Sequence, residues 1–165
     1  MNKFVFLVLA AMAIVLLFCG CFYFRNGKNK MKASDLTYYH YKIYNGYSGI
    51  SFEYEIVLKD SVVTATVRDC NLLTDSCKVY SANNVSREKL EEIGKMLVKS
   101  KVQNWESSYS NPDVFDGDNW SLSVKFGKDE LWSNGYMAWP DNDPTDYINE
   151  IISDMCKPQN ENVEP

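Results

Sequence analysis

The architecture of this 165-residue chain is set by the segment Ile50-Ser51-Phe52-Glu53-Tyr54-Glu55-Ile56-Val57-Leu58-Lys59. Apolar side chains occupy every second position of its first nine residues, which is the period of a β-strand with one buried face. Lys59 and Asp60 form a turn, and residues 62–70 return as a second strand rich in β-branched side chains. A short third strand is expected at 78–80. The region therefore begins with hairpin-connected strands.

A helix is predicted to begin after Ser86, a favourable N-cap residue, with Glu88 in the first turn, where the helix dipole favours an acid. Its apolar residues recur at helical spacing and form one stripe: Leu90, Ile93, Gly94, Leu97 and Val98. Two further alternating segments, 120–126 and 130–136, predict a second hairpin. Asp143 and Pro144 then start a last helix. Its expected buried face consists of Tyr147, Ile148, Ile151, Ile152 and Met155.

These elements follow the order β-β-β-α-β-β-α. The expected fold class is α+β, with an antiparallel sheet of about five strands, two helices packed on one face, and an N-terminal membrane segment. The tyrosine-rich segment 38–47 is either a first strand or an extended segment that covers the domain. Residues 105–117 are interpreted as a loop, because they contain Asn-Pro and Asp-Gly turn signals.

The first 24 residues are interpreted as a membrane segment. Residues 4–24 contain no charged side chain and are long enough to cross the hydrocarbon core. One alternative is an uncleaved anchor; a second is a lipoprotein signal in which Cys21 receives the lipid, and a third is an ordinary cleaved signal peptide. The residues before Cys21 resemble a bacterial lipobox imperfectly, because Phe18 and Cys19 stand where the pattern has Leu and a small residue.

The sequence carries opposing signals for the side of the membrane on which the domain lies. Basic residues are frequent in the polar linker 25–36, and the positive-inside rule alone would keep the domain in the cytoplasm. A cleaved or lipidated signal would place it outside, and the cysteine content favours this extracytoplasmic location. The remaining organisation is a single α+β domain at 37–157 and a polar, disordered tail at 158–165.

Composition excludes several functions. The net charge is −5 and the isoelectric point about 4.9, which disfavours a nucleic-acid partner. No phosphate-binding or dinucleotide-binding glycine motif occurs, so no cofactor is expected. The only histidine, His40, is interpreted as lying outside the domain proper, so no histidine base is predicted for a Ser or Cys nucleophile. The chain is therefore predicted not to be an enzyme.

One catalytic alternative remains, a metal-assisted hydrolase that uses the acidic loop Asp113, Asp116 and Asp118. Oxygen-rich loops of this kind hold Ca²⁺, although the spacing here is not that of an EF-hand. Two of the soluble cysteines, Cys70 and Cys77, bracket a loop between two strands and are candidates for a disulfide. The alternative is that these cysteines and Cys156 are buried thiols.

Three pieces of the second half form a recognisable pattern: Trp105-x-x-x-Tyr109, Asp116-Gly117-x-x-Trp120-x-Leu122-x-Val124 and Gly135-Tyr136-x-x-x-Pro140. Together they resemble a group of small bacterial lipoproteins and membrane-anchored proteins of unknown function. The resemblance covers residues 86–156. It implies envelope attachment and a single α+β domain, and it supplies no catalytic residue.

Five aromatic residues are expected near one end of the sheet, where they either pack as core or contact a ligand. They are Trp105, Tyr109, Trp132, Tyr136 and Trp139. The resulting hypothesis is a non-catalytic envelope module that binds an unidentified protein, peptide or glycan and attaches to the membrane through residues 4–24. A structural or inhibitory partner of another envelope protein is the third alternative.

Overall fold

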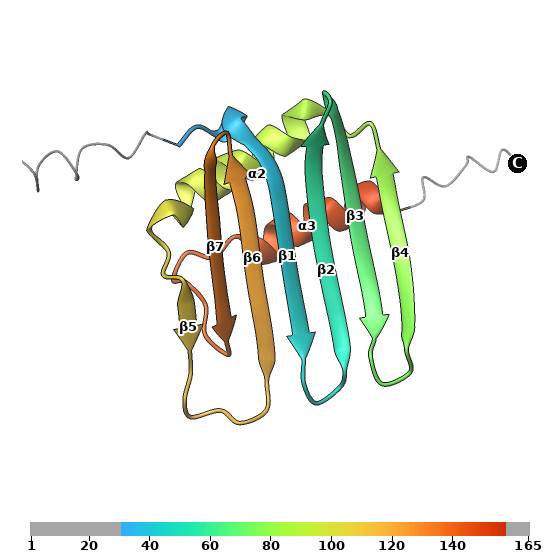
Figure 1. Cartoon of the computed structure of the whole chain (residues 1–165), viewed down its shortest axis with the longest axis vertical. Helices are drawn as coiled ribbons and strands as arrows, with labels where there is room; N and C mark the ends of the chain where they lie inside the picture. The colour runs from blue at the N-terminus through green and yellow to red at the C-terminus, as the bar shows by residue number, and fades with distance from the viewer. Residues whose placement is uncertain (1–30, 158–165) are drawn as a thin grey trace, which may run out of the picture. The chain divides into compact units, whose positions relative to one another are not determined.

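The computed structural model describes residues 31–157, which form a mixed α+β fold with one sheet and two α-helices (Figure 1). The elements in chain order are η1 (Ala33–Asp35), β1 (Leu36–Asn45), β2 (Ile50–Lys59), β3 (Val62–Asn71), β4 (Ser76–Asn83), α2 (Arg87–Lys99), η2 (Val102–Asn104), β5 (Ser108–Ser110), β6 (Asp118–Phe126), β7 (Asp129–Tyr136) and α3 (Thr145–Cys156).

The sheet has seven strands in the order β4-β3-β2-β1-β6-β7-β5, so the prediction of about five strands was wrong. The tyrosine-rich segment is β1, a central strand that pairs antiparallel with both β2 and β6. The loop predicted at 105–117 contains the short strand β5, which pairs parallel with β7. The sheet is therefore antiparallel except at this one edge.

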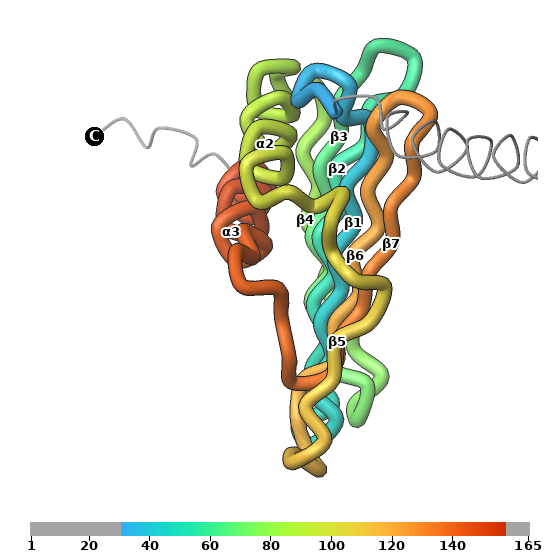
Figure 2. The backbone as a smooth tube through the Cα atoms, turned by 90° about the vertical axis from the view of Figure 1, so that its left-hand side faces the viewer, coloured from blue at the N-terminus to red at the C-terminus, as the bar shows by residue number. Residues whose placement is uncertain are grey.

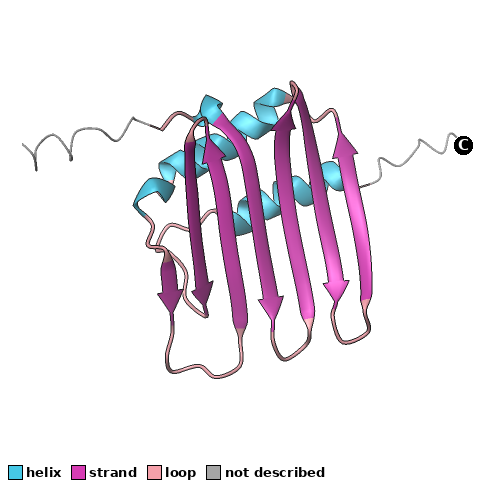
Figure 3. Ribbon diagram, in the orientation of Figure 1, coloured by secondary structure: helices cyan, strands magenta, loops and turns pink. Residues whose placement is uncertain are grey.

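Both α-helices pack on the same face of the sheet, as predicted, and lie across the strands (Figures 2 and 3). Because successive side chains of a strand point to opposite faces, every second one points into the layer between the sheet and the helices. The core is mostly apolar; its largest fully buried side chains are Tyr39, Tyr41, Leu36, Ile56, Leu90, Ile93, Leu97, Leu122, Ile148, Ile152, Val124 and Thr145. The opposite face of the sheet is covered by no element within residues 31–157. We call it the open face.

The start of α2 agrees with the prediction, because the Ser86 hydroxyl accepts a hydrogen bond from the Lys89 backbone N–H. Gly94 allows a close approach. A Cβ at this position would collide with the backbone of Ala33 in η1. η1 therefore packs against α2. η1 lies within the predicted linker 25–36.

α3 begins one residue later than predicted, and the Asp143 carboxylate accepts hydrogen bonds from the Thr145 backbone N–H and hydroxyl at 2.9 and 3.0 Å. Its buried face differs from the prediction. Tyr147 was predicted to be buried but is 67% exposed. Asn149 is buried instead, and its Oδ1 accepts a hydrogen bond from the Tyr39 hydroxyl at 2.8 Å. The residue that α3 directs toward the sheet here is polar, and a search for apolar residues at helical spacing does not predict its burial.

Candidate functional site

The open face is built from alternate residues of six neighbouring strands. Because Tyr39 contacts α3, its neighbours Tyr38 and His40 point to the other side of the sheet. Cross-strand pairing then assigns the rest of the face. Its residues are mostly polar or aromatic, and they include Tyr38, His40, Lys42, Tyr44, Glu53, Glu55, Thr66, Arg68, Ser81, Asn119, Ser121, Ser123, Lys125, Glu130, Trp132, Asn134 and Tyr136.

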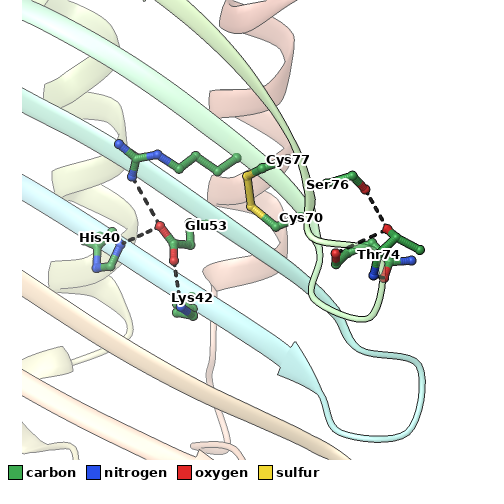
Figure 4. The surroundings of a disulfide bond; sticks show 9 residues. His40, Lys42, Glu53, Cys70, Thr74, Ser76 and Cys77 are labelled. Carbon is green, nitrogen blue, oxygen red and sulfur yellow. Dashed lines mark hydrogen bonds and ion pairs between the residues drawn. A yellow bond between two sulfur atoms is a disulfide. The ribbon is translucent and has the colours of Figure 1, made fainter.

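The centre of the open face is an ion cluster around Glu53 (Figure 4). Its Oε1 lies 2.7 Å from Lys42 Nζ, and its Oε2 lies 3.2 Å from Arg68 and 4.0 Å from His40 Nε2. The hydrogen bond from Lys42 is the largest influence lowering the pKa of the Glu53 carboxyl, although partial burial opposes it. The cluster connects three strands, and its ion pairs hold the carboxylate in place in its charged form.

The aromatic part of the open face lies beside this cluster. Trp132 is 59% exposed, and its cross-strand partner Ser123 is small enough to leave the indole uncovered on that side. Lys125 Nζ lies 5.7 Å from the centre of the Tyr38 ring, within cation–π distance. Tyr136, at the end of β7, is on the same face and half-buried. Two of the five predicted ligand-contact residues, Trp132 and Tyr136, thus belong to the open face.

The other three predicted aromatic residues lie on the helix-covered side. The Trp105 side chain donates to the Ser100 carbonyl at 3.3 Å, and the Tyr109 hydroxyl accepts from the Glu106 backbone N–H at 2.9 Å. Trp139 follows β7 and is 37% exposed. The five residues are therefore divided between the two faces. Trp105 and Trp132 both line a space of about 40 Å³ at the β7 edge.

The acidic loop does not assemble a metal site. Within residues 31–157, no group of three or more His, Cys, Asp or Glu side chains converges as metal ligands. Asp118 accepts a hydrogen bond from Asn45 Nδ2 at 2.8 Å, which ties the loop to the end of β1. Asp113 and Asp116 are exposed. The loop geometry is accounted for by turn formation and strand pairing.

His40 lies in the middle of the sheet, which corrects its assignment to a position outside the domain proper. It is the cross-strand partner of both Ser123 and Glu55, so the residue types of a hydrolase triad occupy neighbouring strands. No hydrogen bond joins Ser123 to His40 in the described part of the chain. The surrounding backbone N–H groups pair within the sheet, so they do not supply an oxyanion hole. This row lacks the geometry of a nucleophilic site.

The structure joins Cys70 and Cys77 in a disulfide across β3 and β4, with their Cα atoms 4.1 Å apart (Figure 4). The two residues are directly paired in the register, and both point to the open face. Cys156 is a buried free thiol at the end of α3, where burial raises its pKa. The sequence signal for the bridge was the pair of strand-like segments on either side of the loop.

No helix in the described part, 31–157, is long and apolar enough to cross a membrane. The predicted membrane segment 4–24, the lipidation candidate Cys21 and the predicted tail 158–165 lie outside the described residues.

A scan of the chain against protein-family models finds no matching family, and a search among curated proteins finds no significant match. The resemblance to small bacterial lipoproteins therefore remains a hypothesis.

Proposed function

We propose that this chain is a non-catalytic, membrane-attached binding module that docks a protein partner on the open face of its sheet. The observation that carries this proposal is the composition of that face, in which Tyr, Ser and Asn surround one exposed Trp. Antibody combining sites use the same residue types. Tyr and Trp provide large contact areas at a low cost in conformational entropy, while Ser and Asn adapt their hydrogen bonds to the partner.

Trp132 is the proposed anchor of the interface. Its side chain is 59% exposed. Burying the indole in a pocket of a partner would remove apolar area from water, which favours binding. Trp, Tyr and Arg dominate the residues whose truncation weakens protein interfaces most. Tyr38, Tyr136 and Arg68 lie on the same face as Trp132. Tyr136 is four residues from the anchor on β7, Tyr38 lies two strands away on β1, and Arg68 lies four strands away on β3.

The charge pattern favours a protein over a polyanion. Acidic and basic side chains alternate across the strands, as in the group of Glu53 with Lys42 and Arg68. A surface that binds nucleic acid or another polyphosphate has one continuous positive sign. A mixed surface instead selects a partner whose charges are complementary in position, which determines specificity more than affinity.

Membrane attachment and an extracytoplasmic location belong to the same proposal. The uncharged segment 4–24 supports attachment. The Cys70–Cys77 disulfide supports the extracytoplasmic side, because disulfides persist in oxidising compartments and are rare in the cytosol. A module of this kind would present its open face to other proteins of the envelope.

Site-specific photo-crosslinking in the native membranes tests the proposal. A benzophenone amino acid replaces Tyr136 on the open face or, as the matched aromatic control, Tyr147, which is 67% exposed on α3. We expect a protein adduct from position 136 only, and we expect Trp132→Ser to abolish it. Equal adducts from both positions, no adduct from position 136, or an adduct unaffected by Trp132→Ser would contradict the proposal.

A further inference from the structure

A second cavity, separate from the open face, lies on the helix-covered side at the C-terminal end of α3. Its volume is about 220 Å³, and it is lined by Phe52, Tyr54, Val67, Asp69, Tyr80, Ser153, Cys156 and Lys157. β2, β3 and β4 form its floor. α3 crosses β2, β3 and β4 and ends at Cys156, and these strands continue past the helix toward the β3–β4 turn (Figure 1). The helix therefore leaves a hollow that is smaller than a typical site for a drug-sized ligand.

The cavity wall is aromatic. The ring centres of Phe52 and Tyr54 are 6.4 Å apart, with their planes inclined by 24°. Tyr80 lies two strands away from Tyr54, because Val67 is the register partner of both, and Tyr80 is 41% exposed. Aromatic faces carry partial negative charge, and several rings around one space attract a cation at their centre.

Asp69 supplies the formal charge of this cavity. It is the register partner of Phe52, so its side chain is on the same face as the rings. Among the described residues, the Asp69 carboxylate forms no hydrogen bond or ion pair, including with its cross-strand partner Lys78. The other charge at the cavity, on Lys157, is paired with Asp154 at 2.6 Å. The hollow thus combines an aromatic wall with a carboxylate that forms no ion pair among the described residues, although its cross-strand neighbour Lys78 lies on the same face.

We infer that this cavity binds a small organic cation with an alkylated ammonium group. A quaternary ammonium has no N–H donor, so apolar walls cost it no hydrogen bond, while the rings and Asp69 compensate its charge. A divalent metal ion does not suit the site, because such an ion requires several oxygen ligands and Asp69 is the cavity's only carboxylate. The chain beyond Lys157 carries two glutamates and no basic residue, so its charge does not complement Asp69.

The test is calorimetric titration of the full-length chain in a sugar-based detergent, with choline as the probe and 3,3-dimethylbutan-1-ol as its neutral isostere. We expect saturable binding of choline and at least about tenfold weaker binding of the neutral analogue, because cation–π and ion-pair terms are lost together. Equal binding of the two probes, or no binding of choline, would overturn the inference. Glycerophosphocholine is titrated in parallel. Tighter binding of glycerophosphocholine identifies a lipid headgroup as the source, and tighter binding of choline identifies a free solute.

Variants locate the site. Asp69→Asn preserves shape and is expected to weaken choline binding about tenfold, whereas Asp129→Asn, the same change on the distant β6–β7 hairpin, leaves it unaltered. Tyr80→Leu, at a partly exposed position, is expected to weaken it about threefold to tenfold with the fold retained. If both cavity variants bind choline as the unaltered chain does, the inference is wrong, and the open-face proposal is unaffected.

Discussion

Replacing Tyr39 by phenylalanine tests the buried polar contact that connects the sheet to α3. Tyr39 is completely buried, and its hydroxyl donates to Asn149 Oδ1 at 2.8 Å in the interior. Phenylalanine keeps the ring in place and removes one oxygen, so the carbonyl oxygen of Asn149 loses its partner at a site only 7% exposed. A buried polar group left without a partner costs about 1–3 kcal/mol. We therefore expect the free energy of unfolding to fall by about 2 kcal/mol.

Urea denaturation of the full-length chain, followed by tryptophan fluorescence, measures this loss. Asn149→Leu is the reciprocal change, and the double variant removes both partners. It should be less destabilised than the sum of the single changes, with a coupling energy of about 1–2 kcal/mol. Tyr147→Phe, at an exposed position on the same helix, is the control and should alter stability by less than about 0.5 kcal/mol. A Tyr39→Phe effect as small as the control, or strictly additive single changes, would refute the reasoning.

Three further predictions follow from individual contacts. Burial raises the pKa of Tyr41 to about 12, so the unfolded chain releases this proton first, and Tyr41 alone should lower stability by about 3 kcal/mol between about pH 10 and 12. Tyr41→Phe should make that part of a pH–denaturation profile less steep by this amount, while Tyr39, whose pKa is also raised by burial, keeps the remaining slope. Gly94→Ala should lower the melting temperature despite its better helix propensity, because the added methyl meets the backbone of Ala33; an increase would contradict this packing. Replacing Cys70 and Cys77 by serine should reduce the urea-derived unfolding free energy by about 2 kcal/mol, because the bridge closes the loop between them and so lowers the conformational entropy of the unfolded ensemble. An unchanged midpoint would contradict this prediction.

The sequence predicts those elements whose signals are local. β2 alternates apolar and polar side chains over residues 50–56, so the row that faces the helices was predictable from the residues alone, although only Ile56 of that row is buried and Ile50 is exposed. α2 combines an N-cap serine with a stripe at helical spacing, and Leu90, Ile93, Gly94 and Leu97 are all buried as expected. Capping and periodicity each require only residues a few positions apart. They specify the secondary structure before any tertiary contact forms.

What the sequence did not predict depends on contacts between distant segments. β1 carries tyrosines at both parities, Tyr38 and Tyr39 among them, so it shows no alternation that marks a buried face. Its place between β2 and β6 is a property of the sheet order. β5 has three residues and pairs with β7 some 26 positions away, as from Ser108 to Asn134, which no local pattern indicates. The open face was missed for the same reason, because its residues come from strands distant in sequence.

The same strands build both proposed binding sites, with alternate residues serving each. On β2, Phe52 and Tyr54 face the cavity, whereas the intervening Glu53 belongs to the open face. A slip of the strand pairing by one residue would exchange the two sets and destroy both sites together. The Cys70–Cys77 bridge joins paired positions directly beside Asp69, so it holds the β3–β4 register where the cavity and the open face meet. Reduction of this bridge should therefore weaken choline binding and partner docking in parallel, whereas a change in Trp132 affects the partner alone.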